Sequence, residues 1–417
     1  CIRDSTNTAD LTIGAVTGGS NTLTLSTENN IANADITASG AISGVTTLTI
    51  SNAGGTATLS GDVDVTTLAV GNTVANLAFT GNGSTVTNDI DFANDGTLTL
   101  GASGGTQTYN GGLDTSGVGS TVTLNGTIAT SNDAVTFGAV TLGSATTIDT
   151  NASNTTGDIA IGAVTGGSNN LTLTTGDNVA NSDITASGAI SGLGNLTLAD
   201  VGGTATFSAN VAAAALSADS TVANLVFTGA SNTFSAASTL ANDGTLQFGD
   251  ATGDSFTFNG GLTTSDVGGT VTLNTSISTS NDALVFGAIT LGNNITLDTN
   301  ATNTTGDLTI GAVTGGSNTL TLTTENNIAN ADITASGNIS GVTTLTLTSV
   351  GGTATFAGDV DVTTLAIGNT VANVAINGNG STITNDIDFA NDGTLQLGDA
   401  SGDTLTFNGG LDTSDVG

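Results

Sequence analysis

The stretch IGAVTGGSNTLTL, residues 13–25, decides the architecture of this chain because it recurs along the sequence. It returns as IGAVTGGSNNLTL from Ile161 and as IGAVTGGSNTLTL from Ile310, so the chain repeats every 148 or 149 residues. The second copy gains its extra residue in the loop after Gly249. Long periods of this kind are typical of arrays in which each repeat packs on its neighbours. We therefore predict one continuous body instead of separate globular domains.

The period divides the chain into four segments. They are an irregular N-terminal segment (1–10), a first copy (11–158), a second copy (159–307) and a truncated third copy (308–417). The sequence does not decide whether Cys1 is a lipidated first residue or a fragment boundary. It also leaves open the organism, the length of the parent protein, the export route and the handedness of the coil.

The first copy divides further into six sub-units when its runs of alternating apolar residues are aligned on the glycine that follows each run. These sub-units start at Leu11, Ala34, Asp62, Ile90, Leu113 and Ala134. Their lengths run from about 21 to about 28 residues, which matches the coils of a β-solenoid. Six coils per copy give roughly sixteen coils in all, and a rod on the order of 75 Å long at about 4.8 Å per coil.

Within each sub-unit, apolar residues alternate with Thr, Ser or Asp, as at Leu23 and Leu25 or at Leu48 and Ile50. This period of two indicates half-buried strands. The 60 glycines supply turns, and the absence of proline leaves every backbone donor available for a sheet. The fold predicted is an all-β parallel β-helix. Immunoglobulin-like sandwiches fit less well because their domains of about 100 residues do not divide the period, and disorder does not explain sustained alternation.

Exchanges between the copies identify the residues that face the core. Three sets of equivalent residues exchange only among apolar or aromatic types: Tyr109, Phe258 and Phe407; Phe79, Phe227 and Ile376; and Phe92, Leu240 and Phe389. A core position accepts only such exchanges. We therefore predict that the aromatic side chains fill the core and do not form a platform for ligands.

Composition excludes several classes of partner. The formal charge is −34, from 35 acidic residues against Arg3 alone. Nucleic acid and anionic membrane surfaces need Lys and Arg, so neither is an expected partner. The sequence contains no run of about 18 apolar residues that could span a membrane. One cysteine and no histidine also exclude an intrachain disulfide and a Cys/His zinc site.

TLTL, TATL and TVTL strands, NGG turns at Asn110, Asn259 and Asn408, and the near absence of Lys, Pro and Cys occur together in this chain. In these features it resembles the repeat shafts of large bacterial surface proteins, namely filamentous-haemagglutinin-type adhesins and autotransporter passenger domains. The resemblance covers nearly the whole chain and implies an extracellular, cell-surface β-solenoid. It implies no functional residue, and the secretion parts of those families are missing from this sequence.

Catalysis finds little support in the residues present. Some β-solenoids are polysaccharide lyases or hydrolases, but this chain has no His or Lys to act as a base near neutral pH. Catalysis by a pair of carboxylates, as in glycosidases, is not excluded by the composition, because Asp is abundant. Glu28 and Glu325 are the only glutamates. We expect a protein that is not an enzyme, with a carbohydrate-active enzyme as the weakest alternative.

One acidic constellation suggests a cation site. Alignment of VDV, IDF and LDT puts Asp64, Asp91 and Asp114 at the same outward position of three successive coils. Stacked carboxylates about 4.8 Å apart repel, and a bound cation with a preference for oxygen, such as Ca²⁺, relieves that repulsion. The third copy repeats the column as Asp361, Asp388 and Asp412, with Asp62, Asp89, Asp359 and Asp386 nearby, whereas the second copy has Ala212, Thr239 and Thr263. The alternative is a solvated acidic face that prevents sheets from associating.

Three functional hypotheses remain. The first is a mechanical shaft or filament-forming region that self-associates end to end or edge to edge, because an uncapped solenoid end presents unpaired strands. The second is an adhesin module that binds glycans or a partner surface. The third is the carbohydrate-active enzyme. Copies that differ by a single inserted residue favour the shaft, since binding sites usually lie on long loops.

Overall fold

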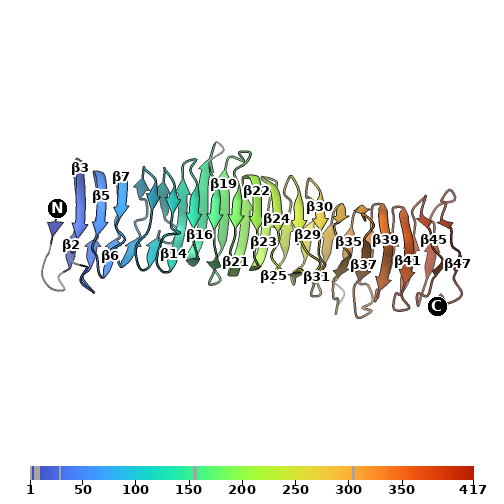
Figure 1. Ribbon diagram of the computed structural model, residues 1–417. Coiled ribbons are helices and arrows are strands. Elements are labelled where there is room, and N and C mark those ends of the chain that lie inside the picture. The colour runs from blue at the N-terminus through green and yellow to red at the C-terminus, as the bar shows by residue number, and fades with distance from the viewer. Residues whose placement is uncertain (1, 4–9, 28–29, 154–156, 303–305) are drawn as a thin grey trace. The chain divides into compact units, whose positions relative to one another are not determined.

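The computed structural model describes the chain except for residues 1, 4–9, 28–29, 154–156 and 303–305 (Figure 1). Every regular element among the described residues is a β-strand. The chain divides into two compact units, Cys1–Ala209 and Asn210–Gly417. Cys1, on which the lipidation hypothesis rests, lies outside the described residues, and so does Glu28.

Unit 1 contains 22 strands. They are β1 (Ile2–Arg3), β2 (Leu11–Ile13), β3 (Val16–Ser26), β4 (Ile36–Ala38), β5 (Ile42–Ser51), β6 (Thr56–Leu59), β7 (Val63–Val70), β8 (Asn76–Phe79), β9 (Thr85–Val86), β10 (Ile90–Asp91), β11 (Leu98–Leu100), β12 (Thr106–Tyr109), β13 (Leu113–Asp114), β14 (Val122–Thr130), β15 (Val135–Phe137), β16 (Val140–Ala152), β17 (Ile159–Ile161), β18 (Val164–Thr165), β19 (Leu171–Gly176), β20 (Ile184–Ala186), β21 (Ile190–Ala199) and β22 (Val201–Phe207).

Unit 2 contains 25 strands. They are β23 (Val211–Ala218), β24 (Val222–Phe227), β25 (Ser231–Phe234), β26 (Ser238–Leu240), β27 (Leu246–Phe248), β28 (Ser255–Phe258), β29 (Leu262–Thr264), β30 (Val271–Leu273), β31 (Ile277–Thr279), β32 (Leu284–Phe286), β33 (Ile289–Leu291), β34 (Ile295–Asp298), β35 (Leu308–Ile310), β36 (Val313–Thr314), β37 (Thr319–Thr323), β38 (Ile333–Ala335), β39 (Ile339–Thr348), β40 (Thr353–Phe356), β41 (Val360–Ile367), β42 (Asn373–Ile376), β43 (Thr382–Ile383), β44 (Ile387–Asp388), β45 (Leu395–Leu397), β46 (Thr406–Phe407) and β47 (Leu411–Asp412).

Each turn of unit 1 passes through three columns of stacked parallel strands. Column 1 begins with β2 and continues through β4, β6 and β8. Column 2 begins with the first part of β3 and continues through the first parts of β5 and β7 to β9. Column 3 holds the last parts of β3, β5 and β7, and further along β10, β13 and β15. All these pairings are parallel, which confirms the predicted parallel β-solenoid.

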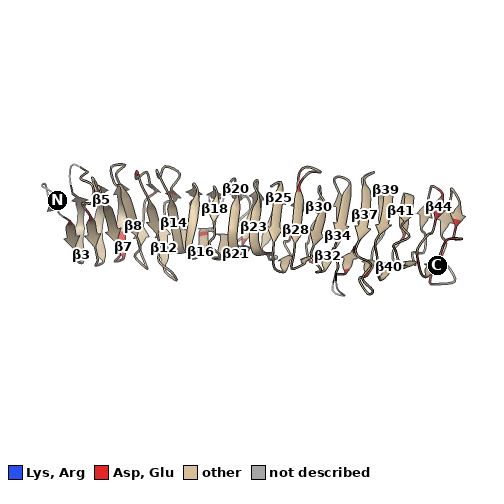
Figure 2. Ribbon diagram, turned by 90° about the horizontal axis from the view of Figure 1, so that it is seen from below, with Lys and Arg blue, Asp and Glu red and all other residues tan. Residues whose placement is uncertain are grey.

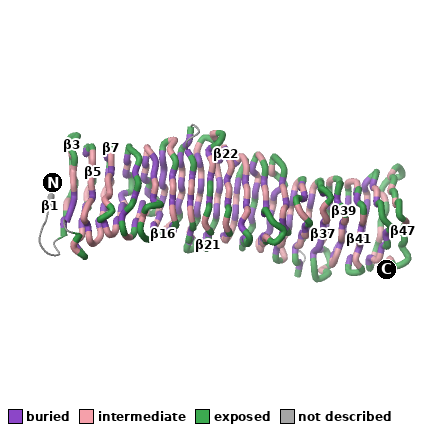
Figure 3. Tube along the Cα trace, viewed as in Figure 1, coloured by how far each residue is buried: buried purple, intermediate pink, exposed green. Residues whose placement is uncertain are grey.

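The core of each unit lies inside the coil and follows from the alternation in the sequence. In β6 and β40, buried and partly exposed residues alternate one by one, as in a strand with one face inward (Figure 3). The aromatic residues at the exchange positions are buried, including Tyr109, Phe258 and Phe227, as predicted. Phe407, in the last stacked turn of unit 2, is only partly buried.

The number of turns exceeds the prediction. The two units contain about 19 turns, about 21 residues apart, instead of roughly sixteen. In column 1, Thr12 leads by successive register pairs to Thr37, Thr58, Ala78, Thr99, Thr123, Thr141 and Thr165. Thr165 is the second copy's counterpart of Thr17, which lies in column 2. One copy therefore makes seven turns less one column, or six and two-thirds turns, instead of six.

Long strands that continue round a corner explain the undercount. β5 continues from column 2, where residues 42–45 pair with β7, into column 3, where residues 47–50 pair with β7, and β7 turns the same corner. The sub-unit 34–61 therefore contains four strand segments, namely β4, both parts of β5 and β6, and the sub-unit 62–89 contains both parts of β7, β8 and β9. Each of these two sub-units makes one and one-third turns, although each was counted as one coil.

Candidate functional site

The structure divides the predicted column of carboxylates. Asp91 and Asp114 are register partners on adjacent turns of column 3, and Asp388 and Asp412 are partners in the same way. Asp64, however, pairs with Thr85 in column 2. In the third copy, Asp361 likewise pairs with Thr382. The alignment of Asp64 with Asp91, and of Asp361 with Asp388, was therefore wrong, and each column of three becomes a pair plus a separate residue.

The spacing along the chain gives the physical reason for this difference. Asp64 and Thr85 are 21 residues apart, which is one turn. Asp91 comes after Thr85 in the sequence, so the chain completes a full turn from Asp64 and passes into the next column before it reaches Asp91. The motifs VDV and IDF look alike because each places an exposed aspartate between two buried apolar residues, but they belong to different sides of the coil.

Burial and the acidic residues around β10 and β13 raise the pKa of Asp89. Burial raises the pKa of Asp89 first, and the charges of Asp91, Asp114 and Asp133 raise it further, against a lowering hydrogen bond from the backbone of Ile90. Like charges that are close together disfavour ionisation in this way. No group of three or more His, Cys, Asp or Glu side chains placed to hold a metal ion occurs in the part of the chain that the structure describes. The calcium site thus remains a prediction, now centred on Asp91–Asp114 and Asp388–Asp412.

Many carboxylates have a structural role at the corners of the coil. Asp35 Oδ1 accepts a hydrogen bond from the Thr56 amide one turn further on, at 2.7 Å, and Asp183 and Asp332 do the same for Thr204 and Thr353. Buried or half-buried amides at a corner need a partner because the ladder is interrupted there. Figure 2 shows acidic positions at many of these bends. Part of the negative charge therefore holds successive turns together.

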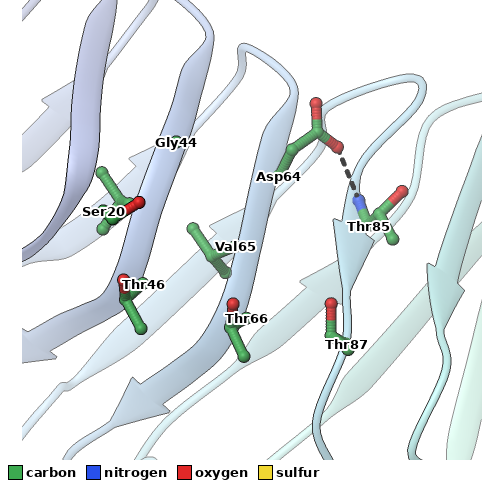
Figure 4. A pocket seen from close by; sticks show the side chains of 9 residues that line it. Ser20, Gly44, Thr46, Asp64, Val65, Thr66, Thr85 and Thr87 are labelled. Carbon is green, nitrogen blue, oxygen red and sulfur yellow. Dashed lines mark hydrogen bonds between the residues drawn. The ribbon is translucent and has the colours of Figure 1, made fainter.

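A polar groove opens on column 2 of unit 1, across four successive turns (Figure 4). Its polar lining comprises Ser20, Thr46, Asp64, Thr66, Thr85 and Thr87. Unit 2 has a groove lined by the same residue types at the equivalent positions: Ser317, Thr343, Asp361, Thr363, Thr382 and Thr384. Asp64 and Asp361 thus line two separate grooves of the same chemistry.

Local backbone geometry produces the hollow. The register between β5 and β7 shifts between Ser43 and Val45, where Gly44 is an extra residue with a φ of 64°. This bulge removes a side chain from the middle of the surface. Val45 and Val65 are 3% and 4% exposed and point into the core, so the residues that follow them, Thr46 and Thr66, point outward.

Sequence reasoning missed the groove residues other than Asp64 and Asp361. The signal was present, since Thr46, Thr66 and Thr87 recur at close to the 21-residue length of one turn. The unequal lengths of the six sub-units obscured it. Gly44, directly before Val45, also marked the bulge in the sequence. A single glycine has many structural roles, however, so this signal alone did not identify a groove.

Two equivalent aspartates in successive copies, Asp298 and Asp149, have raised pKa values. Burial first, and then Glu325 on the next turn, raise the pKa of Asp298 to about 6, against a lowering hydrogen bond from the Asn300 amide. That hydrogen bond to Asp298 Oδ1 is 2.7 Å long. The counterpart in the first copy, Asp149, also has a raised pKa, caused by burial and by Asp200 and Asp177. These carboxyl groups cost free energy when they ionise in the fold.

Comparison with protein-family models, with curated proteins and with solved structures gives no match. The parallel coil, its tandem copies and its aliphatic core are consistent with the repeat region of a β-solenoid protein. Among the described residues no helix is long and apolar enough to cross a membrane.

Proposed function

We propose that this chain is a non-enzymatic structural element, the β-solenoid shaft of an extracellular bacterial surface protein. The supporting observation is that each turn stacks on the next through parallel ladders over a buried aliphatic and aromatic core. Such a core transmits load along the coil, because every turn contacts only its neighbours. The lack of His and Lys, with a single Arg, supports the absence of catalysis.

We further propose that the shaft self-associates, end to end or edge to edge, with other copies. In unit 2, Leu397 and Leu411 are 36% and 46% exposed. Their counterparts in unit 1, Leu100 and Leu113, are buried because β14 and β15 stack on them. A strand row without a neighbour is a template for another strand. A further turn stacked on β45 and β47, from more of the same chain or from another copy, would bury the two leucines in the same way.

Electron microscopy and sedimentation of the 417-residue chain test both proposals. We expect rods that associate at near-physiological salt, where charge repulsion is screened beyond about 8 Å, and we expect chelator to slow their association. Leu411→Asp should weaken association, whereas the control Thr309→Asp, on an outward position of β35, should not. Compact particles would contradict the shaft, and a monomer at every concentration would contradict the association.

A further inference from the structure

The polar groove of column 2 carries chemistry that a shaft does not need. Its lining residues come from four adjacent turns, so it extends about 14 Å along the stacking direction at about 4.8 Å per turn. Figure 4 shows Thr46, Thr66 and Thr87 side by side on successive strands, with Asp64 and Thr85 in a second row. The register agrees with this arrangement, because Val65 pairs with both Val45 and Val86, the residues that precede these threonines.

The two rows form a grid of hydrogen-bonding groups with fixed positions. Outward residues two apart on a strand are separated by about 7 Å, and neighbours across strands by about 4.8 Å. Asp64 Oδ1 accepts a hydrogen bond from the Thr85 amide at 3.1 Å, and Asp361 accepts one from Thr382 at the same distance. Each carboxylate is thus held in place by the next turn. Threonine hydroxyls can both donate and accept, whereas the carboxylate only accepts.

These groups favour a hydroxyl-rich ligand over a metal ion. Asp64 is the single acidic residue among the described residues that line the groove, and Ca²⁺ takes six to eight oxygen ligands, several of them charged. The formal charge of −34 also repels anionic ligands. A row of hydroxyls that repeats about every 4.8 Å suits an extended chain whose own hydroxyls recur at a similar interval.

We propose that each groove binds an extended saccharide of neutral or amino sugars, laid along the stacking direction across the threonine row. The carboxylate of Asp64 or Asp361 accepts hydrogen bonds from sugar hydroxyl or ammonium groups. Without an aromatic residue in the lining the single-site affinity is low, and useful binding comes from several grooves on one saccharide or surface. This binding is independent of the structural role, because the coil stands whether or not the groove is occupied.

The second copy of the chain supplies substitutions for a test. At the positions of Thr46, Asp64 and Thr66 it has Gly194, Ala212 and Ala214. The variant Thr46→Gly/Asp64→Ala/Thr66→Ala, combined with Thr343→Gly/Asp361→Ala/Thr363→Ala, removes the carboxylate and two of the threonine hydroxyls from each groove, with residues that the second copy carries at these positions. A control variant, Asp95→Ala/Asp392→Ala, makes the same change in charge at exposed positions outside the groove.

Titration calorimetry with the full chain would use three probes: oligomers of N-acetylglucosamine, oligomers of glucosamine and oligomers of galacturonate. We expect the neutral and amino oligomers to bind, the anionic one not to bind, and the groove variant to lose at least about tenfold in affinity through its missing hydrogen bonds. The control should bind like the wild type, and circular dichroism should show the fold intact in both variants. The proposal would be overturned if galacturonate bound as well as the other oligomers, or if the groove variant and the control lost equal affinity. It would also be overturned if no saccharide bound at millimolar concentration.

Discussion

The cores of the first and second copies fill the same two positions with different chemistry, a polar pair in the first copy and two phenylalanines in the second. In the first copy, Tyr109 donates a hydrogen bond from its hydroxyl to Gln107 Oε1 at 2.9 Å, inside the coil. Gln107 in turn donates to the carbonyls of Phe79 and Gly81 at 2.9 and 3.2 Å. Burial raises the pKa of Tyr109, so it remains a donor. A small polar network is therefore satisfied within an otherwise apolar core.

The second copy has Phe256 and Phe258 at the equivalent positions. Phe248 lies with its ring centroid 5.2 Å from that of Phe256 and 5.9 Å from that of Phe258, and Phe234 stacks on Phe258 at 4.8 Å. Both solutions leave these side chains buried. The comparison teaches that the core must be filled at these two positions, and that any polar atom placed there needs a hydrogen-bond partner. We therefore expect residues 107 and 109 to change together.

The largest expected effect comes from removing a ring of the aromatic cluster. Phe248→Ala should destabilise its turn by about 3–5 kcal/mol, because a buried cavity replaces the ring. The matched change in the first copy, Leu100→Ala, removes fewer contacts and should cost less. Hydrogen exchange of the amides in β27 and β11 measures the two local effects. Equal loss of protection would show that the cluster adds nothing beyond the volume of a leucine.

Calcium is expected to act on the first and third copies but not on the second. If Ca²⁺ binds only the folded pairs Asp91–Asp114 and Asp388–Asp412, it stabilises by about 2.7 kcal/mol at a hundredfold excess over Kd. Asp91→Thr/Asp114→Thr, which copies Thr239 and Thr263, should remove part of that gain. Melting curves with calcium and with chelator measure it. Identical melting curves with calcium and with chelator would contradict the calcium site and support the alternative, a solvated acidic face.

A smaller effect is expected from breaking the polar pair of the first copy. Tyr109→Phe leaves Gln107 Oε1 without its donor, and an unsatisfied buried group costs about 1–3 kcal/mol. The double variant Gln107→Phe/Tyr109→Phe reproduces the second copy at these two positions and should recover part of the loss. Denaturant unfolding of the two single variants and the double variant gives the coupling energy. Strict additivity would show that the two positions are independent.

The smallest effect concerns pH and Asp298. Between its ordinary pKa of 3.8 and the native pKa of about 6, the folded protein binds more protons than the unfolded chain. The free energy of unfolding should therefore rise as pH falls from about 7 towards 4, as far as Asp298 contributes. Asp298→Asn should raise the melting temperature at pH 7–8 and flatten this dependence, with Asp149→Asn as the matched variant. A melting temperature of Asp298→Asn that falls at pH 8 would contradict the argument.

The sequence was sufficient to predict the fold but not the arrangement of its sides. Alternation at Leu48 and Ile50 reported inward and outward faces correctly, because that property depends only on the strand period. The column to which Asp64 belongs depends on how many corners the chain has turned, and the corner between the two parts of β5 lies inside a run that reads as one strand. The uncertain position of the corners also hid the groove. Its residues align on successive strands only when the chain is divided into turns of the observed length.

The fractional number of turns in a copy has a consequence for how such a gene can grow. Each further block of the same length in a continuous coil begins one column away from the start of the block before it. Tandem duplication therefore does more than lengthen the coil, since it carries each surface motif of the duplicated block to a new side. Three blocks return the motif to its first side after twenty turns. Radial, three-way display thus arises from recombination alone, without any point mutation.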